Sequence, residues 1–308
     1  MKTKTLLRGL NLVAGAGAVI LALSPTNAMA ARPGTVTVTV TAVAKHDASV
    51  PPVKRDDAQL YLNKERTQIV DWKPGEKLYL AVLIDDSLDS GVASQWSDLK
   101  AFLTSQPATT YISVAFARNG EAMLAQDFTN DHQLAAKALR IPVGGGGAFS
   151  SPYLALVDLM KRLPASGERR SILLFSSGID YLRGNFPTSP DLTSAIERAR
   201  KQNINIWSIY APDAGHRARG FFLTSQAQSN LSQLADESGA ESYYLGTGAP
   251  VTFKAYLDEI SLHLSNQYLL TFNGSGGAKG RFQRVRVTTE LPNVELLAPR
   301  EVFLPPAQ

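Results

Sequence analysis

Cysteine is absent from the 308 residues of this chain. Disulfide bonds, thiolate metal sites and cysteine nucleophiles are therefore excluded. Histidine occurs only four times, at His46, His132, His216 and His263, which leaves few candidates for a histidine-built zinc site. Tryptophan occurs three times, so the sequence indicates no aromatic surface on which nucleic-acid bases would stack.

A strong excess of charge is also missing once the first segment is set aside. The chain carries 31 Lys and Arg against 27 Asp and Glu, and removing Lys2, Lys4 and Arg8 leaves 28 basic residues against the same 27 acidic ones. A nearly neutral mature chain does not favour nucleic acid or an anionic membrane surface as partner. Apolar residues make up 44% of the chain, enough for a real hydrophobic core in one or two domains.

The first thirty residues have the pattern of a secretory signal peptide. A basic start precedes the small and apolar stretch 10–23, Pro25 ends that stretch, and 28–30 is an Ala-Met-Ala cleavage pattern. A membrane anchor is the alternative, but the apolar stretch is shorter than the ~20 residues that a spanning helix needs. We therefore expect cleavage after Ala30 and export to the periplasm or out of the cell, with no membrane span afterwards.

The two ends of the remaining chain, 31–75 and 266–308, have the short alternating patterns of β-strands. Within 35–43, valines and threonines alternate, which predicts a strand with one buried face. Each flank alone has too few strands to cover a face, so we expect the two to pair into one small β-sandwich-like domain. Further flank strands are predicted at 58–62, 68–72, 267–272, 282–289 and 294–297.

Residues 76–265 alternate predicted strands and helices. The continuous apolar runs 78–84 and 172–175 are typical of strands covered on both faces, and Asn119-Gly120 is a hairpin turn pattern. The fold class predicted is therefore α/β, a doubly wound and mostly parallel sheet inserted into the β-sandwich-like domain. The expected divisions are a signal peptide at 1–30, flanks at 31–75 and 266–308, and the inserted α/β domain at 76–265.

Polar side chains follow the first strand of the inserted domain. Asp85, Ser87 and Asp89 come directly after the apolar run, and in open α/β sheets ligands bind outside the carboxyl ends of the strands. Carboxylate and hydroxyl oxygens suit Mg²⁺ or Ca²⁺. A polar loop whose Asp and Ser cap the next helix is the alternative. The spacing alone leaves both interpretations open.

At these residues the chain resembles the von Willebrand factor A domain family, and more narrowly the bacterial secreted "VWFA-related" proteins. The resemblance is carried by LAVLIDDSLDSG (80–91), GGGGAFSSPYLALVDLM (144–160) and RSILLFSSGID (170–180), together with the order of the elements. It covers about 76–265 and extends into the flanks. It implies a Rossmann-like domain that binds protein partners at a metal-ion-dependent adhesion site.

The resemblance also implies which positions form that site. The family has Asp-x-Ser-x-Ser in the first loop, a Thr in the second and an Asp before Gly in the third, often completed by an acidic residue of the partner. Here Asp85 and Ser87 match, Asp89 replaces the second Ser, Ser150 replaces the Thr and Ser177 replaces the third-loop Asp. Two outcomes follow. Either Asp85, Ser87, Asp89 and Ser150 hold Mg²⁺, Mn²⁺ or Ca²⁺ in an altered site, or the site is degenerate and the surface binds its partner without metal.

The negative charges of these loops need a positive counter-charge. Asp180 is a further candidate to replace the carboxylate lost at Ser177. The aspartates within 85–89 would repel one another without a counter-charge. That charge is expected from a bound cation, or from Arg183 or a nearby lysine.

Catalysis is disfavoured by what surrounds Asp85. Aspartate-nucleophile phosphotransferases carry a second Asp two residues on, where this chain has Ser87. No G-x-S-x-G surrounds Ser176 or Ser177, and the glycines at 144–147 lack the Gly-Lys-Ser/Thr of a phosphate-binding loop. We therefore expect a non-enzymatic exported protein-binding or adhesion module. The alternatives are a structural component of an envelope assembly with a vestigial site and, less favoured, an Asp85-dependent phosphotransferase or hydrolase.

Two other features are assigned ordinary roles. The apolar cluster 221–223 is expected in the core, although an exposed cluster would mark an interface. His216 is expected in a solvated basic loop. His132 and His263 fall on predicted helices and are expected to be surface or boundary residues.

Overall fold

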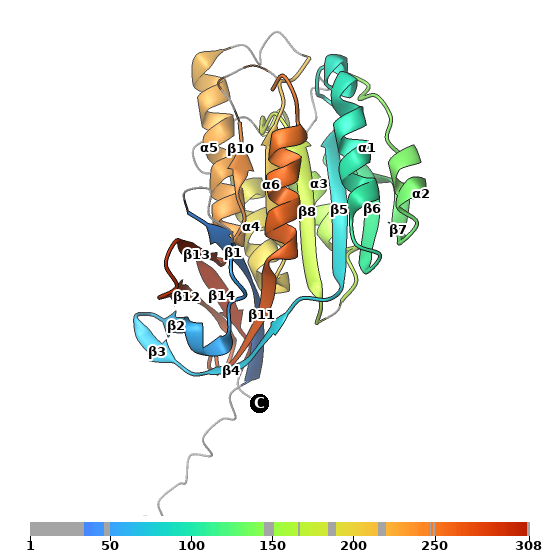
Figure 1. The fold of residues 1–308 in the computed structure, drawn as a ribbon. Helices are drawn as coiled ribbons and strands as arrows, with labels where there is room; N and C mark the ends of the chain where they lie inside the picture. Colours follow the sequence, from blue (N-terminus) through green and yellow to red (C-terminus); the bar gives the residue numbers. More distant parts are fainter. Residues whose placement is uncertain are drawn as a thin grey trace, which may run out of the picture. The chain divides into compact units, whose positions relative to one another are not determined.

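Six strands form the central sheet in the computed structural model of this chain (Figure 1). The structure describes residues 34–45, 50–144, 151–165, 167–183, 189–214, 220–244, 246, 248 and 250–306. The sheet order is β10-β9-β8-β5-β6-β7, and every neighbouring pair is parallel except β6 with β7. The strand bounds are β5 Leu78–Asp85, β6 Thr110–Arg118, β7 Glu121–Thr129, β8 Arg169–Ser176, β9 Asn205–Tyr210 and β10 Ser242–Tyr243.

Helices cover both faces of this sheet, which is why its central strands are apolar throughout. One face packs against α1 (Trp96–Ser105), α2 (His132–Lys137) and α6 (Lys254–Ser265). The other face packs against α3 (Pro152–Met160), α4 (Pro190–Gln202) and α5 (Phe221–Ser238). The predicted doubly wound, mostly parallel α/β sheet is therefore confirmed.

The structure confirms the hairpin turn and the helix cap that the sequence predicted. Asn119 and Gly120 join β6 to β7 with φ of 52° and 77°, the left-handed pair that a two-residue hairpin needs. The Ser189 hydroxyl accepts a hydrogen bond from the Leu192 amide at 3.3 Å and caps α4, with Pro190 in its first turn.

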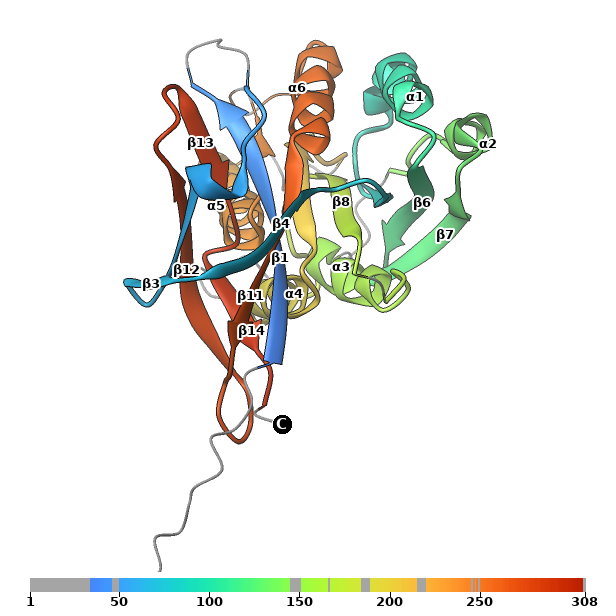
Figure 2. The same ribbon diagram turned by 60° about the horizontal axis from the view of Figure 1, so that its bottom comes forward.

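The two flanks together form two four-stranded antiparallel sheets around one core. Their orders are β13-β1-β11-β4 and β14-β12-β2-β3, so each sheet contains strands from both ends of the chain. Figures 1 and 2 show these strands gathered on one side, next to the central sheet. The predicted β-sandwich-like pairing is thus confirmed. The bounds are β1 Gly34–Ala44, β2 Ala58–Leu62, β3 Glu65–Thr67, β4 Ile69–Pro74, β11 Gln267–Gly274, β12 Arg281–Thr289, β13 Val294–Leu297 and β14 Glu301–Leu304, with short 3-10 turns at Arg55–Asp57 and Ser90–Gln95.

The structure corrects the expectation that β1 has only one buried face. Thr39 and Thr41 are as buried as the valines beside them. Asn203, at the end of α4, accepts a hydrogen bond from the Thr39 amide at 2.8 Å, and the Gln267 amide group donates to the Thr41 hydroxyl at 3.3 Å. The threonine face of β1 is therefore in contact with the end of α4 at Thr39 and with the neighbouring strand β11 at Thr41.

Residues 31–308 form one compact unit, so the flank and insertion boundaries at 75 and 265 remain predictions from the sequence. Within the part of the chain that the structure describes, none of the helices has both the length and the apolar character that a membrane span requires.

Candidate functional site

The carboxyl ends of β5 and β8 meet at the point where the sheet reverses its order. After β5 the chain continues into α1 on one face, and after β8 it continues into α4 on the other. Such a switch point opens a crevice between the two outgoing loops. Asp85 ends β5 and Ser176 ends β8, so Asp85, which the sequence singled out, lies at this switch point together with Ser176, which it did not propose as a site residue.

Asp85 is fully buried and held by hydroxyl and amide donors. Its Oδ1 accepts hydrogen bonds from the Ser87 hydroxyl at 2.8 Å and from the Ser87 amide at 3.1 Å. Its Oδ2 accepts from the Ser176 hydroxyl at 2.9 Å, and Ser176 Oγ in turn accepts from the Gly178 amide at 2.9 Å. The first and third loops are thereby linked through one carboxylate.

A second carboxylate, which the sequence analysis did not single out, acts on Asp85. Burial raises the pKa of Asp85 above its ordinary value, hydrogen bonds from Ser87 and Ser176 oppose the shift, and the charge of Asp213 adds to it. Asp213 follows β9, and its segment is joined to the first loop because the Ala214 amide donates to the Ser87 carbonyl at 3.1 Å. The signal in the sequence was a carboxylate just beyond another buried strand.

Asp86 receives its counter-charge from Arg140, not from Arg183 or a lysine. The guanidinium contacts both carboxylate oxygens of Asp86, at 2.6 and 2.9 Å, and lies over the Phe116 ring at 3.7 Å. Burial alone would raise the pKa of Asp86, but Arg140 and the Val143 amide together hold it below its ordinary value. Arg183 instead pairs with Asp191 at 3.0 Å.

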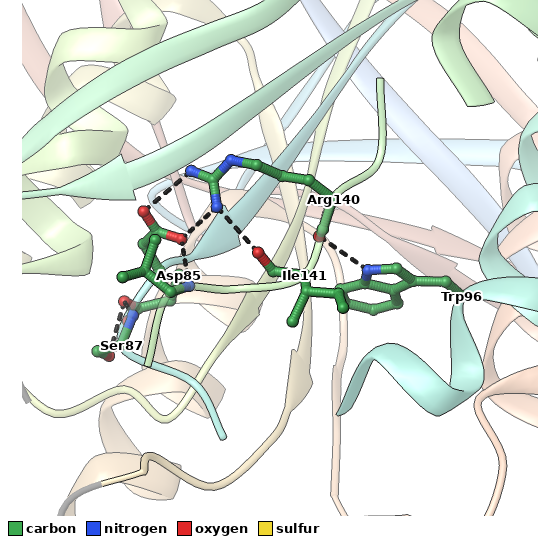
Figure 3. Close-up of polar contacts among 7 residues, drawn as sticks. Asp85, Ser87, Trp96, Arg140 and Ile141 are labelled. Carbon is green, nitrogen blue, oxygen red and sulfur yellow. Dashed lines mark hydrogen bonds and ion pairs between the residues drawn. The ribbon is translucent and has the colours of Figure 1, made fainter. Parts of the chain in front are cut away.

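Figure 3 shows how Arg140 is positioned. The Trp96 indole donates to the Arg140 carbonyl at 2.9 Å, and the Arg140 guanidinium also donates to the Ile141 carbonyl at 3.1 Å. Trp96 packs in the core against Phe175, and its indole N–H holds the segment that follows α2.

The remaining predicted site residues lie in different surroundings. Asp89 is exposed, and its carboxylate accepts from the Gly91 amide at 2.8 Å, so it caps the short turn before α1. Ser150 lies outside the described residues. The buried Ser177 hydroxyl accepts from the Ile179 amide at 3.3 Å. Asp180 is buried and hydrogen-bonded with the side chain of Ser151, next to the second loop.

Apolar side chains surround this crevice in an unexpected way. Phe221 and Phe222 are 70% and 87% exposed, so the expectation that 221–223 belongs to the core is wrong for its first two residues. They begin α5, and their two rings contact each other with 5.9 Å between centroids. We call seven exposed side chains at the carboxyl edge of the central sheet the apolar rim: Ile141, Val143, Leu182, Phe221, Phe222, Tyr244 and Val251.

The donor set at the crevice fits a hard divalent cation in its chemistry. Asp85, Asp213 and Ser87 offer carboxylate and hydroxyl oxygens, the ligands that Mg²⁺, Mn²⁺ and Ca²⁺ take. The charge of Asp213 raises the pKa of Asp85, and a nearby positive charge would stabilise the ionised form of Asp85. The described geometry brings Asp85 and Ser87 together, whereas Asp89 lies exposed at the end of the first loop.

Fold and site together define a doubly wound α/β protein with buried carboxylate and hydroxyl groups at its switch point. No family model matches the sequence, and no curated protein matches it.

Solved structures are similar to the chain at low identity. A von Willebrand factor type A protein from Catenulispora acidiphila is 11% identical with a TM-score of 0.46, over 91% of this chain and 75% of that one. An aerotolerance-related membrane protein from Bacteroides fragilis is 11% identical with a TM-score of 0.44, over 61% and 98%. The VWA domain of SpRpn10 is 12% identical with a TM-score of 0.41, over 59% and 94%. Such values concern the fold alone and carry no activity or partner to this chain.

The strand order and helix layers of the chain itself agree with the von Willebrand factor A-like fold that the sequence predicted.

Proposed function

We propose that the chain is an exported, non-enzymatic protein-binding module whose partner docks on the carboxyl edge of the central sheet. The apolar rim is the observation that carries this proposal. Twelve large apolar side chains are exposed among the described residues, and seven of them belong to the rim. Clustered exposed apolar groups around polar ones are typical of protein interfaces.

The burial of Asp85 supports binding over catalysis. A nucleophilic carboxylate must be reached by its substrate, whereas Asp85 has no exposed surface and accepts three hydrogen bonds from Ser87 and Ser176. An Asp85-dependent phosphotransferase is therefore the weaker candidate. The adhesion role and the altered cation site at Asp85, Ser87, Asp89 and Ser150 remain part of the proposal, as does export after cleavage at Ala30.

Site-specific photo-cross-linking tests the docking surface. A photoreactive residue at Phe222 is expected to cross-link a defined protein in the exported fraction of the native cell, and the same group at Leu262, exposed on α6 away from the rim, is not. The double change Phe221→Ser and Phe222→Ser is expected to abolish the interaction, while Leu262→Ser leaves it intact. Equal cross-linking from both positions contradicts the proposal.

Thermal unfolding tests the cation. If the crevice binds it, millimolar-range Mn²⁺, Mg²⁺ or Ca²⁺ raises the melting temperature of the wild type and not that of Ser87→Ala or Asp85→Ala. Ser87→Ala is included because it removes one hydroxyl and leaves the buried carboxylate in place. No shift with any of the three cations in the wild type removes the cation from the proposal and leaves the docking surface standing.

A further inference from the structure

A second group of metal-ligating side chains lies away from the crevice, at the amino end of β10. Glu241 directly precedes β10, and Glu259 and His263 lie on α6. The two α6 residues are four apart, so their side chains share one face of the helix. One oxygen or nitrogen atom from each of the three side chains lies within 4.8 Å of the others.

The imidazole of this group is buried, contrary to the expectation that His263 is a surface or boundary residue. Its side chain is 7% exposed and packs on the Trp207 ring at 5.4 Å between centroids. His263 Nδ1 lies 3.6 Å from Glu241 Oε2 and 3.3 Å from the Tyr243 hydroxyl. That hydroxyl donates to Glu241 Oε2 at 3.1 Å, and it has a single proton to give. Glu241 Oε2 and His263 Nδ1 therefore cannot both accept a hydrogen bond from Tyr243.

Negative charge accumulates around the group. Burial raises the pKa of Glu241, the hydrogen bond from Tyr243 opposes this shift, and the carboxylates of Glu259 and Glu295 add to it. Burial also raises the pKa of Glu259. Lys45 lies 3.4 Å from Glu295 and is engaged there. A cation bound between the two α6 side chains and Glu241 would relieve the mutual repulsion of the carboxylates.

We propose that Glu241, Glu259 and His263 form a binding site for Zn²⁺ or a similar divalent transition-metal ion. An imidazole nitrogen with carboxylate oxygens is a donor set of Zn²⁺, whereas Mg²⁺ and Ca²⁺ take oxygen ligands alone. In tetrahedral zinc sites the ligand atoms are about 3.4 Å apart, so rotation of the two flexible glutamates closes the group around the ion. Water fills the fourth position, and the ion joins α6 to the chain entering β10.

Calorimetric titration tests the site with Zn²⁺ alone as the probe. The protein is prepared without a polyhistidine tag and stripped with EDTA. We expect one equivalent of Zn²⁺ to bind, and we expect Glu259→Gln and His263→Gln each to weaken binding by about tenfold or more. The matched controls are Glu197→Gln, an exposed glutamate on α4, and His132→Gln, a histidine on α2, and both should bind like the wild type.

Co²⁺ gives a second readout that does not depend on affinity. Visible absorption of bound Co²⁺ reports a low-coordinate site with a nitrogen ligand, and it should be lost in His263→Gln and kept in His132→Gln. Glu259 is exposed, so Glu259→Gln decides the question if His263→Gln fails to fold.

Three results would overturn the proposal. The first is unchanged Zn²⁺ affinity in Glu259→Gln. The second is Zn²⁺ binding that is lost in Ser87→Ala, which places the ion at the crevice. The third is no binding at about 100 µM Zn²⁺, which leaves the group holding only protons. The docking surface proposed at the carboxyl edge is independent of each of these outcomes.

Discussion

Asp86 and Arg140 show how a single side chain governs the first loop. The Asp86 side chain is 4% exposed and that of Arg140 is 42% exposed, so the pair is half screened by water. Removing one partner of a buried pair leaves the other charge without compensation. We expect Arg140→Met, which removes the guanidinium and keeps an unbranched side chain, to lower the free energy of unfolding by about 1–3 kcal/mol at neutral pH.

The sign of the pH dependence follows from the pKa of Asp86. Arg140 holds that pKa below its ordinary value of 3.8, so the stabilisation is complete above pH 3.8 and is lost as the pH falls below it. In Arg140→Met the buried carboxyl protonates readily, and the difference from the wild type should shrink toward zero in acid. Urea unfolding at neutral pH and near the acid limit measures this. Arg162→Gln, which breaks an exposed pair with Asp158, is the control, with a loss below about 1 kcal/mol. A loss in Arg140→Met that is equal at both pH values contradicts the argument.

Gly178 is the residue of the third loop that allows no side chain. Its φ is 72°, and a Cβ there would lie 2.7 Å from the Ala227 carbonyl oxygen and 2.8 Å from Leu231 Cγ on α5. We expect Gly178→Ala to cost about 2 kcal/mol or more, from left-handed strain and the clash together. Gly167→Ala, where nothing lies within 4 Å, is the control and should change the melting temperature little. A tolerated Gly178→Ala would mean that α5 moves easily away from the third loop.

Site residues that are neighbours in the sequence were predictable. Site residues that contact each other from distant parts of the sequence were not. Asp85 and Ser87 follow a buried strand, so their place at the carboxyl edge comes from a local pattern. Arg140 reaches Asp86 from a loop 54 residues on, and nothing in its own surroundings marks it as a charge partner. Asp213 had a weak local signal, a carboxylate just after a strand, that only the pairing of loops makes meaningful.

At the scale of elements, the end of α4 fixes the first strand of the sandwich. Asn203 ends α4 in the left-handed conformation, with φ of 52°, and its side chain both accepts from the Thr39 amide and donates to the Thr39 hydroxyl. We expect Asn203→Gly to cost about 1–3 kcal/mol, because it keeps the helix end and leaves a buried amide without its acceptor.

Asn203→Ala separates the two contributions. It removes the same hydrogen bonds and adds left-handed strain of about 1–2 kcal/mol, so the order of stability should be wild type, then Asn203→Gly, then Asn203→Ala. Chemical denaturation of the three proteins measures this. Asn203→Gly with wild-type stability would show that the contact with β1 contributes nothing.

Helices and strands were predictable where the sequence of the segment itself carried a strong pattern. The central strands, the β6–β7 hairpin and α4 follow from apolar runs, the Asn119-Gly120 turn and the Ser189 cap. The short strands β3 and β14 were not predicted as strands, because three or four residues are too few to show a strand pattern of their own and depend on the neighbouring strand that pairs with them. The buried threonine face of β1 depends on Asn203, which is 164 residues away.

At the scale of the whole molecule, the inserted α/β part and the flanks share buried contacts. Arg169, at the start of β8, is buried and donates to the Leu264 carbonyl at the end of α6 and to the Gln267 side chain at the start of β11. Gln267 in turn donates to the Thr41 hydroxyl on β1. If one of the two parts unfolded alone, the buried Arg169 guanidinium would lose some of its hydrogen-bond acceptors, which is unfavourable.

One cooperative unfolding transition is therefore expected for the sandwich and the central sheet, although the chain crosses between them twice. Trp72 stacks on Tyr268 at 4.9 Å in the sandwich, and Trp207 is fully buried in the central sheet, so each reports one part. Two single-tryptophan proteins are prepared, one retaining Trp72 and one retaining Trp207, with the other tryptophans changed to Phe. In each protein, the urea midpoint followed by tryptophan fluorescence should equal the midpoint followed by circular dichroism. If the fluorescence midpoint of one protein departs from its circular dichroism midpoint, the two parts unfold separately and the Arg169 junction does not couple them.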